Sequence, residues 1–430
     1  MAVSIRGLLP KLYLTAAIAG LIGTSGAASA QSTTRELPPD EVPRGATVAE
    51  RPRPDYDPPG VRLGGFLLLP DLTVAESFNS NIYATQNNPA SDFITAVSPK
   101  VDLRSDWGSH ALNLHADSTI VRYTTHDSEN YNDYTLATDG RLDVLRDLQL
   151  FGGAGYQVRH EPRSSPDNQG GVEPTEYSVA SVNAAVEKTF NRLVMRLDGK
   201  AERYVYQDVA AANGTTISQS GRDRDQSELS LRSGYEFAPH RQIYALGAAN
   251  NRRYDNTLDS GGFARDSDGY LMALGTSYDI DGVIIVDIYA GYREQNYDDA
   301  RLDSIGGWTS KGKLTWNVTR LTTITGTLSR EIEETTLANA SGYFATVANL
   351  RADHELLRNL LLNASVGYED DDFEGIGRND RYYTGTLGAK YLLNRNFSLS
   401  AGYGYRTRNS DAANSDFSEN VVFLRLSSHL

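Results

Sequence analysis

The sequence predicts an all-β protein, a transmembrane antiparallel up-and-down β-barrel of about 18 strands. Three observations lead to this fold class. Apolar and polar residues alternate with a period of two along many segments. Short turns recur about every 40 residues from residue 64 to the C-terminus. The composition, with 38 Gly, 25 Tyr and no Cys in 430 residues, favours strands and tight turns over helices.

The first 30 residues have the pattern of a secretory signal peptide. A basic start at Arg6, an apolar run over residues 12–22 and small residues at 28–30 precede Gln31. The alternative is an uncleaved membrane anchor, but the run is too short and too rich in Gly and Ala to span a membrane comfortably. We therefore expect export and cleavage after residue 30.

Residues 31–60 form a separate, Pro-rich segment. They hold seven of the 15 prolines, mixed with charged residues and few apolar ones. Such a composition predicts an extended periplasmic tail, which is either a spacer or a docking segment for a periplasmic partner. The expected organisation is a signal peptide at 1–30, this tail at 31–60 and a barrel at 61–430.

The turns set the number of strands. Eight short turns bound sixteen strands, and one further strand at each end completes the barrel and places both termini in the periplasm. The opening strand is expected from Phe66 to about Phe78, with an interruption at Pro70, and the closing strand from Val421 to Leu430. The turns are centred near Gly108, Asp147, Asn191, His240, Asp281, Arg320, Arg358 and Arg395.

Alternating charge separates a membrane barrel from a soluble β-protein. In residues 193–203 four charged residues alternate with apolar ones. Burying these charges in a dry sandwich core would cost several kcal/mol for each unpaired ion, so they must face water. A soluble propeller or sandwich is the alternative, but long strands at regular spacing fit it poorly.

Tyrosines and the closing strand fit an outer-membrane location. Val422, Leu424, Leu426 and Leu430 share one face of the last strand, which resembles the terminal signal read by the barrel assembly machinery, although Ser428 interrupts it. Tyrosines on the apolar face near strand ends are typical of rings at the level of lipid and lipopolysaccharide head groups. They are Tyr235, Tyr278, Tyr292, Tyr368, Tyr391, Tyr403 and Tyr405.

Sequence motifs for chemistry are scarce. The seven histidines are scattered without metal-ligand spacing, and no nucleophile elbow or phosphate loop occurs. We therefore expect no enzyme, cofactor or metal, although a hydrolase assembled from distant residues on the outer wall is an alternative. The acidic stretch 369–374 could hold a divalent cation but reads better as a solvated loop tip. A formal charge of −14 without a basic patch argues against nucleic acid.

The polar face of the strands supplies candidate pore-lining residues of both signs. They are either interior ion pairs that brace the barrel or a polar track for a hydrated solute. The candidates are Arg104, Arg141, Arg196, Asp198, Lys200, Glu202, Arg232, Asp287, Arg293, Lys311, Lys313, Arg351, Lys390 and Arg406.

The first hairpins carry a family resemblance. Residues 53–64 (RPDYDPPGVRLG), the stretches 66–70 and 78–85, and residues 91–110 with Leu103-Arg104-Ser105-Asp106-Trp107 are similar to the opening of the putative β-barrel porin 2 family. The resemblance runs from about residue 53 to the end and is strongest at its start. It implies an outer-membrane barrel, often accompanying exopolysaccharide or capsule biosynthesis, and it brings no catalytic motif.

Three functional classes follow. The expected function is a passive conduit in the Gram-negative outer membrane, for which the resemblance implies exopolysaccharide export with periplasmic export components as partners. A general diffusion porin, or a structural or adhesive barrel with a plugged lumen, is the alternative. The two rivals differ in whether the lumen of a barrel this wide is open.

Overall fold

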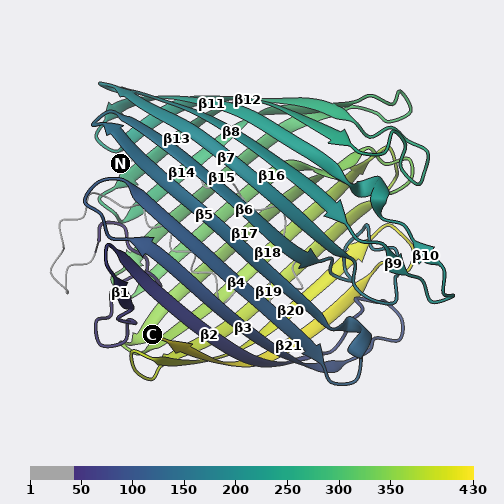
Figure 1. Cartoon of the computed structure of the whole chain (residues 1–430), viewed down its shortest axis with the longest axis horizontal. Helices are drawn as coiled ribbons and strands as arrows, with labels where there is room; N and C mark the ends of the chain where they lie inside the picture. The colour runs from purple at the N-terminus through teal and green to yellow at the C-terminus, as the bar shows by residue number, and fades with distance from the viewer. Residues whose placement is uncertain (1–42) are drawn as a thin grey trace.

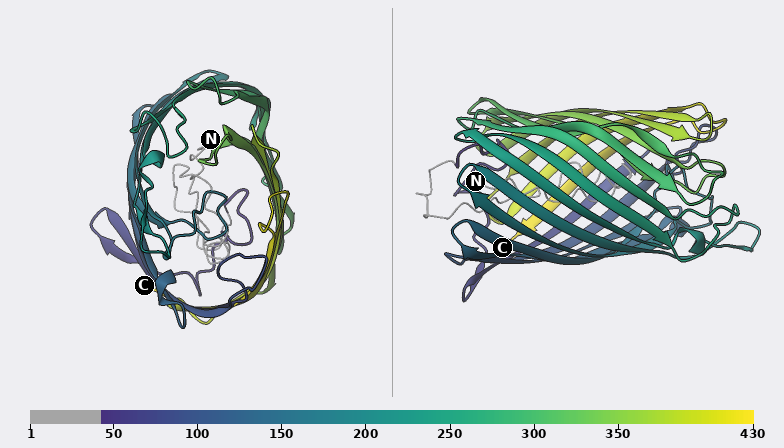
Figure 2. Two further views of the ribbon diagram at one scale, coloured as in Figure 1. Left: turned by 90° about the vertical axis from the view of Figure 1, so that its right-hand side faces the viewer. Right: turned by 90° about the horizontal axis from the view of Figure 1, so that it is seen from above.

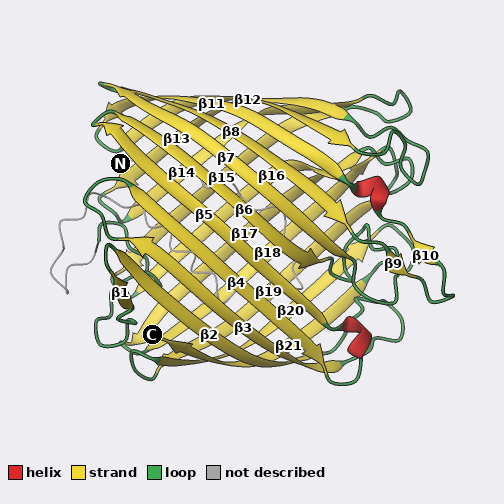
Figure 3. Ribbon diagram, in the orientation of Figure 1, coloured by secondary structure: helices red, strands yellow, loops and turns green. Residues whose placement is uncertain are grey.

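The computed structural model describes residues 43–430, so the expected signal peptide and the first part of the expected tail lie outside the described residues. The chain forms one 19-stranded antiparallel sheet, in which the three-residue β1 is a spur and the other 18 strands close into a barrel (Figures 1 and 3). This confirms the predicted fold class and strand number. None of the helical segments in residues 43–430 is long and apolar enough to span a membrane.

The barrel strands in chain order are β2 (Phe66–Asn79), β3 (Asp92–Ser105), β4 (Ala111–Tyr123), β5 (Tyr131–Leu145), β6 (Leu148–His160), β7 (Glu176–Phe190), β8 (Leu193–Tyr206), β11 (Arg224–Ala238), β12 (Arg241–Tyr254), β13 (Ser267–Ile280), β14 (Ile284–Tyr297), β15 (Ile305–Thr319), β16 (Thr322–Glu334), β17 (Gly342–Leu357), β18 (Leu360–Glu374), β19 (Asn379–Leu392), β20 (Phe397–Ser410) and β21 (Phe417–His429). The short elements are β1 (Val61–Leu63), β9 (Val209–Ala210), β10 (Thr216–Ile217) and the 3₁₀ turns η1 (Asp127–Glu129) and η2 (Ser220–Arg222).

Each strand pairs with the next one in the chain, and the last pairs with the first. The small β9–β10 hairpin lies in the connection between β8 and β11, so these two strands are neighbours in the barrel. Strand β21 closes the ring against β2, from Asp71 opposite His429 to Asn79 opposite Val421. Seen end-on, the strands make one oval ring, which leaves no free barrel edge (Figure 2).

The eight predicted turns all lie where the sequence placed them. They are short, and Asn191, His240 and Asp281 take the left-handed backbone conformation, with φ of 55°, 61° and 53°. Asn and Asp tolerate this region better than other residues with side chains, so they mark the tight turns. In Figure 1 the short turns lie at one end, with β1 and the C-terminus, and the longer connections lie at the other.

The prediction that Pro70 interrupts the opening strand is wrong. Strand β2 runs through Pro70, which lies opposite Val101 of β3. On its other side, β1 pairs with residues 66–68 and β21 pairs only from Asp71 onward. Pro70 therefore sits at the change of neighbour, where a missing backbone N–H breaks no ladder hydrogen bond.

The acidic stretch 369–374 is also not a loop tip. It forms the end of β18, with Asp371 buried, and only residues 375–378 connect it to β19. Asp370 points to Arg381 of β19 at 3.4 Å, so a basic side chain on the neighbouring strand balances one of the acids. Charge density alone made this segment look like a loop.

The outer face of the barrel is apolar. Leu274 of β13 has 73% of its surface exposed, and Met272, two residues away on the same face, has 68%. In a membrane these side chains contact lipid, which explains why large apolar groups can lie on an outer surface. Aromatic rings also lie exposed on this face, including Tyr235, Tyr292, Tyr391, Tyr403 and Tyr405.

Candidate functional site

The inner wall carries the candidate pore-lining residues. On β8, Leu197 is exposed on the outer face, while Arg196 points inward and stacks over the ring of Phe151 at 4.5 Å. Because side chains alternate along a strand, the neighbours two positions away share the inner face. By the same alternation all fourteen candidates face the interior of the barrel.

Half of the fourteen candidates are paired with a neighbour on the same strand. Arg196 lies 2.8 Å from Asp198, and Lys200 lies 2.8 Å from Glu202. The same spacing of two residues joins Arg141 to Asp143, Arg351 to Asp353 and Arg104 to Asp102, at 2.9, 2.6 and 3.6 Å. Residues two apart share a face of a strand, so each pair lies flat along the wall.

Other candidates pair between strands or stand apart. Arg232 of β11 bonds Asp287 of β14 at 3.0 Å and stacks on Tyr244 at 3.5 Å. Lys311 and Arg293 share Glu331, at 3.3 and 3.9 Å. Within residues 43–430, Lys313 and Lys390 have no carboxylate oxygen within 4.0 Å.

A loop that sequence reasoning did not single out as a lumen element crosses the interior at the end with the longer connections. Residues 161–175 join β6 to β7, and their polar side chains are buried, with Ser164 fully so. A connection of this length without secondary structure is uncommon and is usually functional, which is the only sequence signal for it. Its buried residues include Glu161, Ser164, Ser165, Asp167 and Thr175.

Ion pairs fix the near side of this loop. Glu161 bonds Arg222 at 2.7 Å, and Arg163 bonds Glu129 of η1 at 2.5 Å. Burial alone would lower the pKa of the Arg222 guanidinium, but the Glu161 carboxylate raises that pKa well above its ordinary value. The Arg222 guanidinium therefore stays charged beneath the loop.

The tip of the loop reaches β20, six strands away around the barrel from β6. The Ser164 hydroxyl accepts a hydrogen bond from Arg406 at 3.1 Å, and the Ser164 carbonyl accepts one from Arg408 at 2.9 Å. Arg406 is 2% exposed, so the structure places this candidate in an anchor for the loop and not in contact with water. The loop therefore spans part of the lumen.

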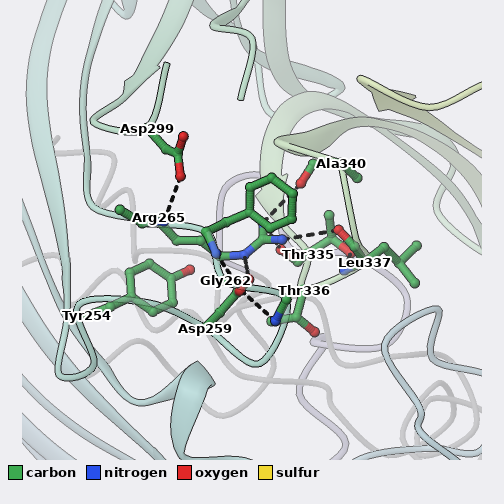
Figure 4. A network of polar contacts seen from close by, with 12 residues as sticks. Tyr254, Asp259, Gly262, Arg265, Asp299, Thr335, Thr336, Leu337 and Ala340 are labelled. Atoms are coloured by element: carbon green, nitrogen blue, oxygen red, sulfur yellow. Dashed lines mark hydrogen bonds and ion pairs between the residues drawn. The ribbon is translucent and has the colours of Figure 1, made fainter. Parts of the chain in front are cut away.

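A second loop folds inward to meet the first. Residues 335–341 join β16 to β17, and Arg265 donates hydrogen bonds to the carbonyls of Thr335, Ala340 and Leu337 at 2.7, 3.0 and 3.1 Å (Figure 4). Asp259 pairs with Arg265 from the other side. One fully buried guanidinium thus holds three carbonyls of a loop that would otherwise extend from the barrel.

The two inward loops touch at Asp167. Its Oδ1 accepts hydrogen bonds from the Thr335 hydroxyl at 2.7 Å and the Thr336 backbone N–H at 2.9 Å. β6 and β16 lie eight strands apart around the barrel, nearly opposite each other. The two loops together therefore narrow this mouth, which we call the loop-bearing mouth.

The other mouth is bordered by an N-terminal segment, residues 43–57, which we call the strap. It runs along successive short turns: Arg44 bonds Asp279 at 2.9 Å, the Val48 N–H bonds Thr323 at 2.9 Å, and Arg53 bonds Glu355 at 2.6 Å. Arg358 and Arg395 then donate to strap carbonyls at 3.0 and 2.8 Å. The strap lines the rim from the β13–β14 turn to the β19–β20 turn.

Arg53 is expected to be the main anchor of the strap. Its buried guanidinium donates to Glu355 and to the Val48 carbonyl at 2.7 Å, so Arg53→Met leaves buried acceptors without a charged donor. We expect amide hydrogens of residues 46–57 to exchange at least about tenfold faster, corresponding to roughly 1.4 kcal/mol of local stability. Hydrogen exchange measured by mass spectrometry checks this.

The control for this prediction is Arg62→Met, which breaks the exposed pair between Arg62 and Asp106. Exposed pairs contribute little, so exchange in the strap should not change. Equal exchange in wild type and Arg53→Met would show that the strap is held by its backbone contacts instead.

Residues 43–430 contain no group of three or more His, Asp or Glu placed to hold a metal ion. The acidic end of β18 is included in this finding. The arrangement that the structure does provide is a wall of paired charges between two bordered mouths.

The comparison with protein families agrees with a barrel of this kind. The family model described as putative beta-barrel porin 2 matches residues 53–429. No curated protein matches the chain. Solved structures that resemble it include OccK2 (OpdF) of Pseudomonas aeruginosa, at 14% identity over 85% of this chain and 100% of that one, with a TM-score of 0.47.

Two further structures show a similar level of likeness. OpdK of Pseudomonas aeruginosa, solved with vanillate, is 12% identical over 84% of this chain and 99% of that one, with a TM-score of 0.44. A BenF-like porin of Pseudomonas fluorescens Pf-5 is 12% identical with the same coverage and a TM-score of 0.43. At these identities no side-chain role passes from these proteins to this chain.

Proposed function

The chain belongs to the putative β-barrel porin 2 family and lies in the Gram-negative outer membrane, and from this premise we propose that it is a passive channel for small hydrophilic solutes. One observation carries the proposal. Half of the candidate charges of the inner wall pair along their own strands, as in Arg196–Asp198 and Lys200–Glu202. Side chains paired this way lie against the wall and leave the centre of the barrel to water.

Barrel size supports the same conclusion. Barrels of 16 to 18 strands are wide enough to leave an aqueous channel, whereas about eight strands leave room only for side chains. Both charge signs line the wall in neighbouring pairs, so the field along the path is weak. A weak field favours neutral or zwitterionic solutes over a single class of ion.

Export of an exopolysaccharide, which the family resemblance implies, is the alternative. The path of a polymer would cross the loop-bearing mouth, where Asp167 joins the two inward loops. Those buried contacts would have to stay broken for as long as the polymer is being exported. Small solutes need only the space beside the loops, so we favour them. The family and the fold are those of channel proteins, and no observation on residues 43–430 argues for catalysis.

Uptake into liposomes tests the proposal. Liposomes containing the purified barrel should swell in neutral sugars, at rates that fall as the sugar becomes larger, and protein-free liposomes should not. The absence of swelling with any sugar would contradict a passive channel. Loss of surface polysaccharide after deletion of the gene would instead favour the export role.

The N-terminus of the mature protein is expected at Gln31. Residues 1–30 have the charge, apolar run and small residues of a signal peptide. Mass spectrometry of the protein from outer-membrane fractions checks this. A chain that keeps residues 1–30, or begins elsewhere, would contradict the prediction.

A further inference from the structure

One carboxylate on the inner wall has an unusual set of donors. Glu334, the last residue of β16, accepts a hydrogen bond from the Tyr254 hydroxyl at 2.6 Å and one from the Tyr297 hydroxyl at 3.3 Å. It also forms an ion pair with Arg252. The Arg252 and Glu334 side chains are 11% and 9% exposed, so the ion pair is largely shielded from solvent.

All three donors lie on wall strands other than β16, and the acceptor lies at the end of β16. Arg252 and Tyr254 lie on β12 and Tyr297 on β14, in continuous register with their neighbours. The end of β16 differs, because its pairing with β15 stops at Arg330 opposite Ser310, while β15 continues along β14. Beyond this point β16 is an edge strand whose partner is β17, and β17 stays paired with β18 as far as Gly342 opposite Glu374. The end of β16 packs over the inner wall.

Apolar contacts hold the end of the β16–β17 hairpin against the wall, and the donor atoms take no part in them. Ile332 and Phe344 of the hairpin pack with Ile305, and Tyr297 lies beside them. If the Glu334 side chain turned away, Arg252 and the two tyrosines would stay in place on the barrel wall. They would then be unpaired donors facing the lumen, which is the donor set of a carboxylate site.

A second guanidinium lies beside this set. Arg224 of β11 stacks over Tyr204 at 4.4 Å and lies 5.8 Å from the ring of Tyr254. It donates to the Arg222 carbonyl at 3.0 Å, and in the described part of the chain no carboxylate oxygen lies within 4.0 Å of it. An anion that reached this wall would therefore meet two guanidinium groups and two phenol hydroxyls.

We propose that Arg252, Tyr254 and Tyr297, with Arg224 beside them, form a binding site for the carboxylate of a small anionic solute, and that Glu334 occupies this site when no solute is bound. The inference rests on the proposed function, since it places a substrate site within the channel. It adds a preferred class of ligand, small hydrophilic carboxylates, to a wall that is otherwise balanced in charge.

Competition at this site would also affect the loop-bearing mouth. Glu334 directly precedes the loop 335–341, which Arg265 and Asp167 hold inward. A solute carboxylate that displaces Glu334 removes one attachment of this loop. The apparent affinity for the solute is proportional to the fraction of time that the site is free of Glu334. A change that weakens the contact of residue 334 with the donors should therefore tighten solute binding.

The test is calorimetric titration of the purified full-length protein in detergent, at low ionic strength, with galacturonate and with neutral galactose. We expect galacturonate to bind and galactose not to bind. Glu334→Gln should bind galacturonate at least about tenfold more tightly, because a neutral amide competes poorly for the guanidinium. Glu374→Gln, which removes the same charge at the exposed end of β18, should bind like wild type.

A donor-deficient variant completes the test. Tyr254→Phe with Tyr297→Phe keeps the rings and removes both hydroxyl donors, so it should fold and lose most of the galacturonate affinity. Equal binding of galactose and galacturonate, or unchanged affinity in both Glu334→Gln and the double variant, would overturn the site. Sugar uptake without galacturonate binding would support the channel and contradict the carboxylate site. Galacturonate binding without sugar uptake would support the site and contradict the channel.

Discussion

Replacing Leu350 with arginine is expected to destabilise the barrel by about 2–4 kcal/mol, because the side chain lies on the lipid face near the middle of β17. Leu350 is 50% exposed on the outer wall, between Gly326 and Val366 of the neighbouring strands. A guanidinium at this depth loses its hydration without gaining a partner. Urea unfolding of the protein in lipid vesicles measures the cost.

Asn349→Arg is the matched control. Asn349 precedes Leu350 on the same strand, so its side chain points into the barrel, where it is exposed. The same new charge should then cost little and should act mainly on ion flow. Equal destabilisation by the two substitutions would mean that the assignment of the lipid face and the inner face is wrong.

Shortening the loop that crosses the lumen is expected to raise conductance several-fold. Removing residues 164–173 and bridging the ends with glycine and serine takes away the contacts of Ser164 with Arg406 and of Asp167 with Thr335. The loop-bearing mouth then widens, and the current through a channel grows with its cross-section. Single-channel recordings in planar bilayers measure the change.

The control for the loop is the exposed tip of the β9–β10 hairpin. Residues 212–214 lie at this tip, on the outside of the same mouth, and their removal should leave conductance unchanged. A shortened 161–175 loop with wild-type conductance would show that another part of the path limits the current. In that case the strap along the opposite rim becomes the element to remove.

The sequence predicted the barrel well because its signals are local. Asn191 and Asp281 mark turns through their own backbone preference, and alternation over residues 193–203 separates the two faces without reference to distant segments. Pro70 and the acidic end of β18 were misjudged for a related reason. Pro70 was interpreted from its residue type and the acidic segment from its composition. Pairing with the neighbouring strands determines that both lie within strands.

The contacts at the mouths could not be predicted in this way. Asp167 meets Thr335 across 168 residues of sequence, and Arg53 meets Glu355 across 302. Nothing near Asp167 in the sequence indicates which loop it contacts, because the closure of the barrel determines which loops lie opposite each other. The inner face was predictable residue by residue, but the partner of Glu334 depends on where β16 stops pairing with β15.

The most direct test of a passive aqueous channel is the ion current through the purified wild-type barrel in a planar bilayer. Discrete steps of constant size, with current proportional to voltage and rising with salt concentration, are the predicted result. A bilayer that stays silent with wild-type protein and with the loop-shortened variant, although both are folded, would show a closed lumen and contradict the account.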